Sequence, residues 1–341
     1  MILRIQRLPR AQRTLIFIAF LVGGVLLIVA ITVGLILLSF NTGRDQSVAL
    51  VEGVTAGEFA VLPDDDAYPA TVAVGPDGAV YTASYVSGAV WSITPDGSVR
   101  ELPGTRAAFE AVSGLAVGPD GTLYVIDLDD ANPLTLGGEV RRIDPQGSIT
   151  PFAVPGDERG FLLPDDLALD AQGRVYVSDR GRAEVWRFEA DGSGGIAWWT
   201  PPEAGSGDDT RPAPTGLSYD SAHDALIITD SNLNTIYRVS ITTGEGEQLY
   251  RHVGQEYVPG LDGVTTAPDG TIYAAALEQN GLVRLKDGDL EYIAGVFRGL
   301  SDVAYFEGKI YAANFDSFSL LVPLVHPRLP FALDVIELPA P

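Results

Sequence analysis

Carboxylate and hydroxyl side chains recur at the start of six similar apolar segments of this chain. The residues two places before the first apolar residue of each segment are Ala70, Ser113, Asp165, Thr215, Asp262 and Ser301. The next position in each segment holds Thr71, Gly114, Asp166, Gly216, Gly263 and Asp302. If the six segments surround one axis, these oxygens converge, and Ca²⁺ binds about six to eight oxygens. We therefore take Asp165, Asp262, Thr215 and Asp302 as candidate ligands of a divalent ion, most simply Ca²⁺, and Asp166 as a contact beside them.

A third polar set follows the second apolar run of each segment. Its members are Ser84, Asp127, Asp179, Asp230, Ala276 and Asn314. On one interpretation Asp127, Asp179, Asp230 and Asn314 are contacts at the same rim as the candidate ligands. On the other, they hydrogen-bond to amides of neighbouring loops, as short polar side chains commonly do.

The elements that would position these residues are short strands in a repeating unit. A turn such as Pro-Asp-Gly separates two apolar runs, and aligning on it gives Gly78, Gly121, Gly173, Ala225, Gly270 and Gly308, spaced 38 to 52 residues apart. Asp-Gly supplies the positive φ angles of a tight hairpin. Units of about 40 to 50 residues made of short strands are typical of β-propeller blades. Six units predict six blades.

A second turn shows that each unit holds four strands. Gly97, Gly192 and Gly244 each follow their first-turn residue by 19 residues, whereas Gly147 follows by 26. The alternation and the β-branched residues favour strands over helices. The sequence predicts an all-β fold, a six-bladed β-propeller of four-stranded antiparallel blades. Two closing strands compete for the last blade, one at 58–63 and one at 333–339.

The two rims of this propeller differ in their loops. The short turns between strands A and B and between strands C and D lie on one rim. The starts of the A strands, the B–C loops and the connections between blades lie on the other, which carries the insertions 128–138, 155–161 and 201–212. Loops of variable length on a rigid scaffold commonly carry binding sites. We therefore expect function at this second rim, called the loop rim below.

Composition excludes several classes of function. The formal net charge is -23, which disfavours nucleic acid as a partner because phosphates attract clustered Lys and Arg. The chain has no cysteine, so disulfides, thiolate metal sites and a Cys nucleophile are excluded. Nucleophile-elbow, phosphate-loop and dinucleotide motifs are absent from the sequence.

The N-terminal region has the composition of a membrane anchor. Residues 14–40 are 27 uncharged residues, more than the roughly 20 that a spanning helix needs. Arg4, Arg7, Arg10 and Arg13 precede them without an acid, so the positive-inside rule places this end in the cytoplasm. A cleaved signal peptide would have a shorter apolar core. We expect a cytoplasmic tail (1–13), a transmembrane helix (14–40), a linker (41–57) and an extracytoplasmic propeller (58–341).

Three strings of sequence resemble a known family. LPDDLALDAQGRVYVSD (163–179), LDGVTTAPDGTIYAA (261–275) and GLVRLKDG (281–288) are similar to the gluconolactonase/regucalcin (senescence marker protein) family of six-bladed propellers, with NHL-repeat proteins close in pattern. The resemblance covers roughly residues 60–338. It implies a divalent metal in the central channel and hydrolysis of a sugar lactone.

Individual residues carry this resemblance to different degrees. Asp262 matches the family's ligand aspartate, which is also its proposed general base. Asp165 and Thr215 stand where the family has asparagines, and Ala70 stands where it has a glutamate. Two functions therefore remain open. One is a metal-dependent hydrolase of a lactone or small ester, and the other is a non-catalytic propeller whose loop rim binds a small molecule, a protein or a glycan.

Overall fold

The computed structural model describes residues 9–40, 46–132, 134–156, 159–202, 210–322 and 325–339. They form two units, which are considered separately: residues 44–317 with 329–341, and residues 1–43 with 318–328. The first unit is the propeller. The predicted loops 128–138, 155–161 and 201–212 lie partly outside the described residues.

Five blades each take their four main strands from consecutive chain, in the order A, B, C and D. Blade one holds β3 (Pro69–Val74), β4 (Val80–Ser84), β5 (Val90–Ile93) and β6 (Val99–Glu101). Blade two holds β7 (Ala111–Val117), β8 (Leu123–Leu128), β9 (Glu139–Ile143) and β10 (Ile149–Ala153). Blade three holds β11 (Pro164–Leu169), β12 (Val175–Asp179), β13 (Glu184–Phe188) and β14 (Ile196–Trp199). Blade four holds β15 (Pro214–Asp220), β16 (Ala225–Asp230), β17 (Thr235–Ser240) and β18 (Gly246–Arg251). Blade five holds β19 (Leu261–Thr266), β20 (Ile272–Ala276), β21 (Gly281–Lys286) and β22 (Asp289–Gly295).

Blade six is built from both ends of the propeller sequence. Its strands are β23 (Leu300–Phe306), β24 (Lys309–Asn314), β25 (Ala332–Glu337) and β2 (Thr55–Val61). Strand β25 pairs with β24 on one side and with β2 on the other. The two segments that compete in the sequence, 58–63 and 333–339, therefore pair with each other, the first as the outer strand and the second as its inner neighbour.

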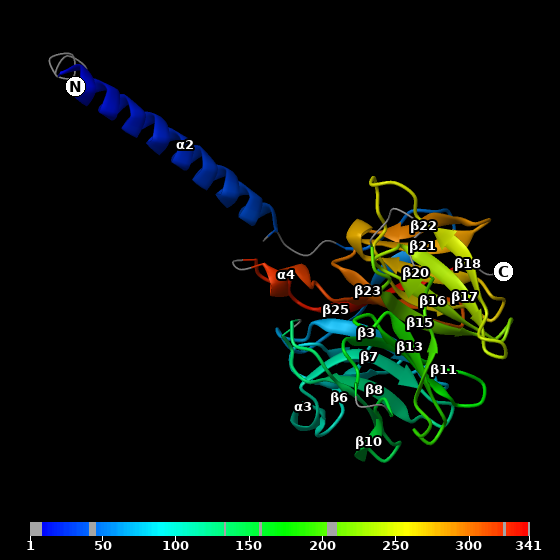
Figure 1. The fold of residues 1–341 in the computed structure, drawn as a ribbon. Coiled ribbons are helices and arrows are strands. Elements are labelled where there is room, and N and C mark those ends of the chain that lie inside the picture. Colours follow the sequence, from blue (N-terminus) through cyan, green and yellow to red (C-terminus); the bar gives the residue numbers. More distant parts are fainter. Residues whose placement is uncertain are drawn as a thin grey trace. The chain divides into compact units, whose positions relative to one another are not determined.

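The inner strands close into a ring. Each A strand contacts the A strand of the next blade, and β23 of blade six contacts β3 of blade one. Figure 1 shows β3, β7, β15 and β23 near the middle of the propeller and β6, β10 and β18 toward its outside. The prediction of a six-bladed propeller with four-stranded antiparallel blades is confirmed.

Part of the expected linker 41–57 is strand. Residues 41–45 lie outside the described residues, but β1 (Val48–Ala49) pairs with β22 as a fifth strand of blade five. Residues 55–57 already belong to β2. The chain is thus held against two blades from Val48 onward.

The recurring turn residues have the backbone geometry that the sequence predicts, with one shift. Gly78, Gly121, Gly173, Gly270 and Gly308 all have positive φ angles. In blade four the positive φ of 47° falls on Asp224, one residue before the aligned Ala225. Asp tolerates this conformation better than most residues, so the turn forms without glycine.

Apolar side chains between adjacent blades form the core. Trp186 and Phe188 of blade three pack with Ile126 and Val140 of blade two, and Phe161 contacts both aromatic rings edge-on. Equivalent clusters lie between other neighbouring blades. Because burial of each large side chain stabilises by about 1.5–3 kcal/mol, these layers hold the ring together.

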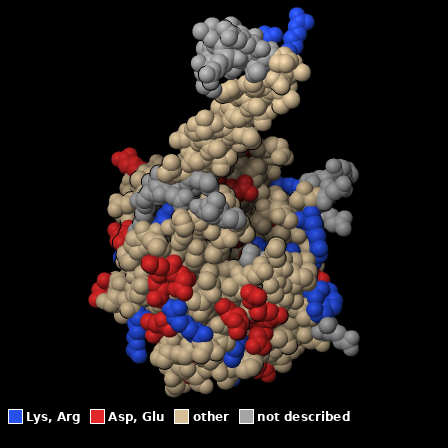
Figure 2. All heavy atoms as spheres, turned by 90° about the vertical axis from the view of Figure 1, so that its left-hand side faces the viewer, with Lys and Arg blue, Asp and Glu red and all other residues tan. Residues whose placement is uncertain are grey.

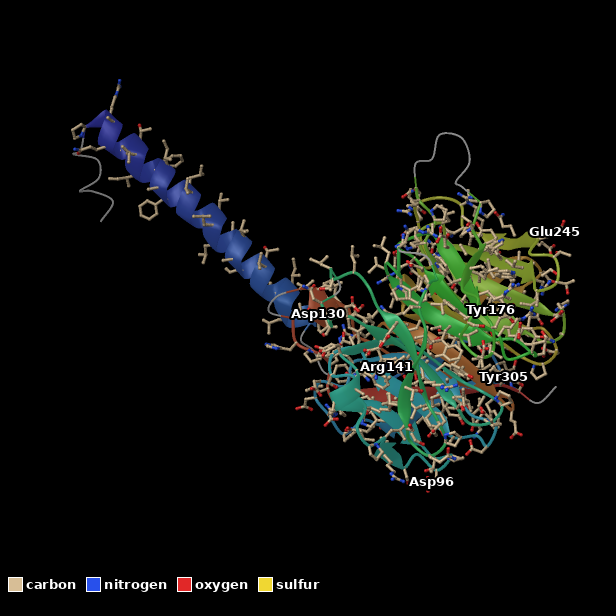
Figure 3. All side chains as sticks on the ribbon, turned by 60° about the horizontal axis from the view of Figure 1, so that its bottom comes forward. Asp96, Asp130, Arg141, Tyr176, Glu245 and Tyr305 are labelled. Carbon is tan, nitrogen blue, oxygen red and sulfur yellow. The ribbon has the colours of Figure 1, made fainter. Side chains whose placement is uncertain are left out.

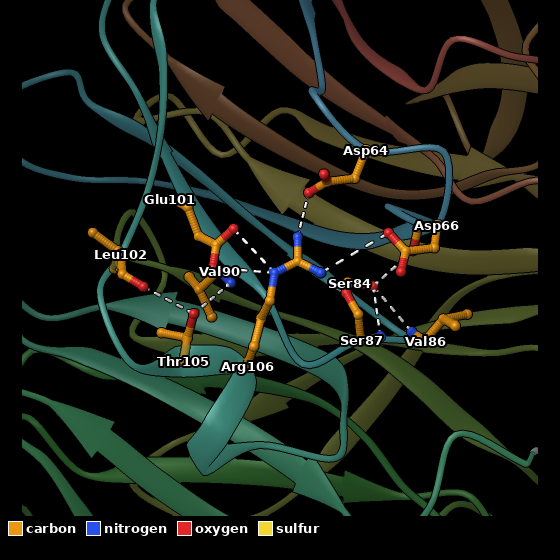
Figure 4. Close-up of polar contacts among 10 residues, drawn as sticks. All are labelled: Asp64, Asp66, Ser84, Val86, Ser87, Val90, Glu101, Leu102, Thr105 and Arg106. Carbon is orange, nitrogen blue, oxygen red and sulfur yellow. Dashed lines mark hydrogen bonds and ion pairs between the residues drawn. The ribbon is translucent and has the colours of Figure 1, made fainter.

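Arg106 fastens the chain where it crosses from blade six to blade one. It lies on the short helix α3 (Thr105–Ala108) and forms ion pairs with Asp64, with Glu101 at 3.0 Å and with Asp66 at 3.9 Å (Figure 4). Its guanidinium also lies over the Trp91 ring, 5.8 Å from the centroid. The connection after β2 is therefore anchored to blade one by charge and by stacking.

The other unit contains the apolar helix. Helix α2 (Arg10–Phe40) has 31 residues, and the span Arg10–Ile36 has a mean hydropathy of 3.0. It is long and apolar enough to cross a membrane by length and composition. The helix begins four residues before the expected span of 14–40. The short helix α4 (Phe318–Leu321) belongs to the same unit.

Candidate functional site

Bulges at the starts of the A strands set the direction of the candidate residues. Strand pairing in β11 shifts between Pro164 and Leu167, and in β19 it shifts between Leu261 and Val264. The residues inside these bulges are Asp165 and Asp166 in β11 and Asp262 and Gly263 in β19. A bulge changes the direction of side chains near the end of a strand. Two successive residues can therefore both point toward the interior of the ring.

Hydroxyl members of the first set link neighbouring blades. Ser113 donates to the carbonyl oxygen of Pro164 at 3.2 Å, and Ser301 donates to that of Ala70 at 2.9 Å. Thr215, which is 1% exposed, donates to the carbonyl oxygen of Leu261 at 3.4 Å. Each bond joins one blade to the start of the next. Thr215 therefore has a structural role between blades four and five.

The second set contains further links between blades. Asp166 accepts a hydrogen bond from the backbone N–H of Leu217 at 2.7 Å, and Asp302 accepts one from the N–H of Val72 at 2.8 Å. Burial and then the nearby Asp302 charge raise the pKa of Asp166 well above its usual value. Burial raises the pKa of Asp302 to about 6, although hydrogen bonds from Val72, Val303 and Thr71 oppose the rise.

In four blades, the third set ties the B strand to the start of its own blade. Asp179 accepts from the N–H groups of Leu162 and Leu163 at 2.7 and 3.0 Å. Asp127, Asp230 and Asn314 accept in the same way from Glu110, Ala213 and Arg298. All four residues are buried. The structure thus places them in loop-to-strand hydrogen bonds rather than on an open rim.

Asp165 is paired with a cation at the channel. Its Oδ1 lies 3.3 Å from Nε of Arg180, which directly follows β12 on the same blade. The Asp165 side chain is 19% exposed and that of Arg180 is 41% exposed. The Asp165 charge, followed by that of Asp262, raises the pKa of Arg180. The guanidinium is therefore a permanent positive charge at this place.

Asp262 differs from the other carboxylates because the described residues offer it no hydrogen bond or ion pair. Only its backbone carbonyl is engaged, by the Thr229 hydroxyl. Burial and then the Asp165 charge raise the pKa of Asp262 well above its usual value, while Arg180 lowers it in part. This carboxylate is the chemically available group of the ring.

Aromatic residues from two further blades stand beside these charges. Tyr85 follows β4 and Phe315 follows β24, and their ring centroids are 5.1 Å apart. Burial raises the pKa of Tyr85. The charge of Arg180 lowers this pKa in part, whereas the charges of Asp165 and Asp130 raise it further. Asp130 lies in the B–C loop of blade two, on a different side of the propeller from Asp96 and Glu245 in the C–D turns (Figure 3). Tyr85 therefore belongs to the loop rim and to the same electrostatic cluster.

The residues present do not fit a calcium centre. Both oxygens of Asp302 accept hydrogen bonds, Oδ1 from Val303 and Oδ2 from Thr71 and Val72. Thr215 is buried and donates its hydroxyl to the hydrogen bond between blades, and Asp165 is already paired with Arg180. Among the described residues, no group of three or more His, Cys, Asp or Glu side chains is arranged to hold a metal ion. Among the described carboxylates at the A-strand starts, only that of Asp262 has no hydrogen-bond or ion-pair partner, and it supplies far fewer than the about six oxygens that Ca²⁺ requires.

Sequence reasoning missed Arg180 and Tyr85. Both stand one place after the third polar set, where the other blades have Leu128, Ser231, Leu277 and Phe315. A single arginine at this position in a chain of net charge -23 was the available signal. What the sequence does not show is that the residue after a B strand contacts the start of an A strand.

Figure 2 shows acidic side chains in several groups over the middle and left of the face in view, and basic side chains beside them and along the right-hand edge.

Comparisons with known proteins agree with this architecture. Residues 134–293 match the family model described as SMP-30/Gluconolactonase/LRE-like region. A gluconolactonase from Xanthomonas campestris is similar in structure, with 14% identity, a TM-score of 0.60, and coverage of 86% of this chain and 95% of that one. No curated protein matches the chain.

Two other solved structures show how varied the activities on this fold are. Catalytically inactive virginiamycin B lyase from Staphylococcus aureus with quinupristin has 15% identity and a TM-score of 0.57, covering 84% of this chain and 99% of that one. PQQ-bound aldose sugar dehydrogenase from Streptomyces coelicolor has 15% identity and a TM-score of 0.57, covering 87% and 99%. Such identities show the fold alone. The chain is a six-bladed β-propeller, and its residues 134–293 are similar to the SMP-30/Gluconolactonase/LRE-like region.

Proposed function

We propose that this protein hydrolyses a lactone or small ester at the loop-rim end of its channel. The observation that carries this proposal is the uncommitted carboxylate of Asp262, beside the Asp165–Arg180 pair. The family match over residues 134–293 and the similarity to a gluconolactonase support the choice of substrate class.

In the proposed reaction Asp262 moves a proton. Water attacks the carbonyl carbon while its proton passes to a carboxylate oxygen of Asp262. The carbon–oxygen ring bond then breaks, and the leaving alkoxide takes the proton back, so that a hydroxy acid is formed. A raised pKa brings the carboxylate closer to the working pH, which favours general base catalysis.

The test is hydrolysis by the purified full-length protein against a panel of sugar lactones, aliphatic lactones and aryl esters. Asp262→Asn keeps the size of the side chain but cannot accept the proton, so kcat should fall about 10²-fold or more. The matched control is Asp269→Asn, in the A–B turn of the same blade on the opposite rim. An inactive wild-type protein, or an Asp262→Asn variant of full activity, would remove the proposal.

A second candidate function, binding without catalysis, is favoured by exposed apolar side chains on the loop rim. Leu134, Val253 and Tyr257 are 85%, 89% and 81% exposed and lie in loops of blades two and four. Binding to glycan and peptide arrays that is lost when all three become serine, and kept by Asp262→Asn, would support this alternative.

The proposed setting is the outer side of a membrane. Helix α2 would anchor the chain, and the arginines at positions 4, 7, 10 and 13 would hold its N-terminus in the cytoplasm. The propeller would then act on substrates outside the cytoplasm.

A further inference from the structure

We propose that the guanidinium of Arg180 is the resident cation of the channel site, and that it binds the carbonyl oxygen of an uncharged lactone or ester. This inference rests on the proposed hydrolysis for its substrate but not for the position of the cation. It makes Arg180 a catalytic residue and the site independent of a divalent ion.

Arg180 has unused hydrogen-bonding capacity. Its Nε faces Asp165 at 3.3 Å, whereas no described residue accepts a hydrogen bond from its terminal Nη groups. The side chain is 41% exposed, so a ligand can reach these donors. Asp165 contacts one edge of the planar guanidinium. Because the group is rigid, the direction of its opposite edge is fixed as well.

The charge of Arg180 interacts with groups from three blades. The groups whose charges act on Arg180 include Asp165 on its own blade, Asp262 on blade five and Tyr85 on blade one. A metal ion shared by Asp165 and Asp262 would have to lie near the same guanidinium. Two cations in one small space repel each other. Arg180 therefore competes directly with a divalent ion for these carboxylates.

The balance of charges decides the class of ligand. One arginine faces Asp165 and Asp262, and the charge of Asp302 also acts on Asp262, so the site has no excess of positive charge for an anionic substrate. A second positive charge on the ligand would be repelled by Arg180. An uncharged molecule with a carbonyl oxygen and a nearby water satisfies both the Nη donors and the Asp262 acceptor.

Arg180 would act on the charge that develops during the reaction. As water adds to the carbonyl carbon, the carbonyl oxygen gains negative charge, and the Nη donors stabilise this oxyanion. The proton of the water goes to Asp262, and it returns to the alkoxide when the carbon–oxygen bond breaks. Fixed donors aimed at a developing oxyanion are commonly worth about 10²–10³-fold in rate.

The experiment that tests this inference measures ion binding as well as catalysis. Full-length wild type, Arg180→Gln, Arg180→Lys and Arg284→Gln are titrated with CaCl₂ by calorimetry in detergent. Arg284 pairs with Glu291 on blade five, so its replacement controls for the change in net charge. We expect no binding by wild type, Arg180→Lys or Arg284→Gln, and a new site with a Kd of about 1 mM in Arg180→Gln.

A second measurement separates this inference from the proposed hydrolysis. Activity of the wild type should be unchanged by EDTA, and Arg180→Gln should lose about 10²-fold in kcat. Calcium binding by wild type, together with loss of hydrolysis in EDTA, overturns the role of Arg180 but leaves the hydrolase intact. A calcium site gained by Arg180→Gln in a protein that hydrolyses nothing on the panel supports the resident cation and removes the hydrolase. Failure of Arg180→Gln to gain a site overturns the inference.

Discussion

The carboxylate of Asp302 on blade six accepts a hydrogen bond from the backbone N–H of Val72 on blade one, at 2.8 Å. This contact closes the ring, because it joins the last A strand of the chain, β23, to the first, β3. Asp166 makes the equivalent contact with Leu217 between blades three and four. Buried carboxylates thus hold two of the blade junctions together.

Protonation of Asp302 should make the folded protein more stable at acidic pH than near neutral pH. Its folded-state pKa of about 6 lies above the unfolded value of 3.8, so the folded state binds the extra proton between these values. The contribution is fully present below pH 3.8 and is lost as pH rises through about 6. By linkage it amounts to about 3 kcal/mol at most.

Asp302→Asn tests this dependence because it removes the titration but keeps the shape. The wild-type Tm minus the variant Tm should be larger at pH 5 than at pH 7.5, since only the wild type gains from protonation. Taking the difference cancels the other titrating groups. An equal difference at both pH values would show that the Asp302 carboxyl has an ordinary pKa.

Gly263 should tolerate no side chain. A Cβ atom at this position would lie 2.3 Å from Oδ1 and 2.6 Å from Cα of Asp302 on the next blade. Gly263→Ala should therefore push blades five and six apart and destabilise by about 1–3 kcal/mol, the usual cost of overpacking. In contrast, Gly57→Ala in β2 has no heavy atom within 4 Å of its new Cβ. Equal urea midpoints for the two variants would contradict the close packing of the ring.

Arg106 should contribute more than an ordinary surface ion pair. It contacts Asp64 and Glu101 as well as the Trp91 ring, and its side chain is 34% exposed. Arg106→Gln should lower the free energy of unfolding by about 1 kcal/mol, the upper end of the range of about 0–1 kcal/mol for exposed ion pairs, because several partners contact the same guanidinium. Lys286→Gln, which loses a pair with Glu291 at 56% side-chain exposure, should change little. The effect of Arg106→Gln should shrink in 1 M salt, and a salt-independent loss would point to packing alone.

The fold was predictable because the local signal repeats. Gly78, Gly121 and Gly173 each lie in the turn of a hairpin whose strands pair over short sequence distances, so a period read from the chain translates directly into blades. Closure was less predictable. The strands at 58–63 and 333–339 have similar patterns, and only tertiary pairing shows that they become neighbours in blade six. Strand β1 has two residues and no sequence signal of its own.

The candidate site was predictable in its carboxylates and not in its cation. Bulges at equivalent places bring Asp165 and Asp262 to the interior, and equivalence is visible in an alignment of repeats. Hydrogen bonding then separates Asp262 from Asp302 and Thr215, and sequence does not reveal hydrogen bonding. Arg180 reaches Asp165 through a long side chain, whose direction depends on the surrounding loops.

The orientation of the chain in a membrane should be readable by cysteine labelling, because the sequence contains no cysteine. Gln146→Cys lies in the exposed C–D turn of blade two, and Gln12→Cys lies near the start of α2. If the arginines before the helix stay inside, an impermeant maleimide should label Gln146→Cys on intact cells and Gln12→Cys only after lysis. The reverse pattern would place the propeller in the cytoplasm, and loss of residues 1–40 from the mature protein would show a cleaved signal. Labelling of Gln146→Cys on intact cells would mean that the channel site meets its substrates outside the cytoplasm.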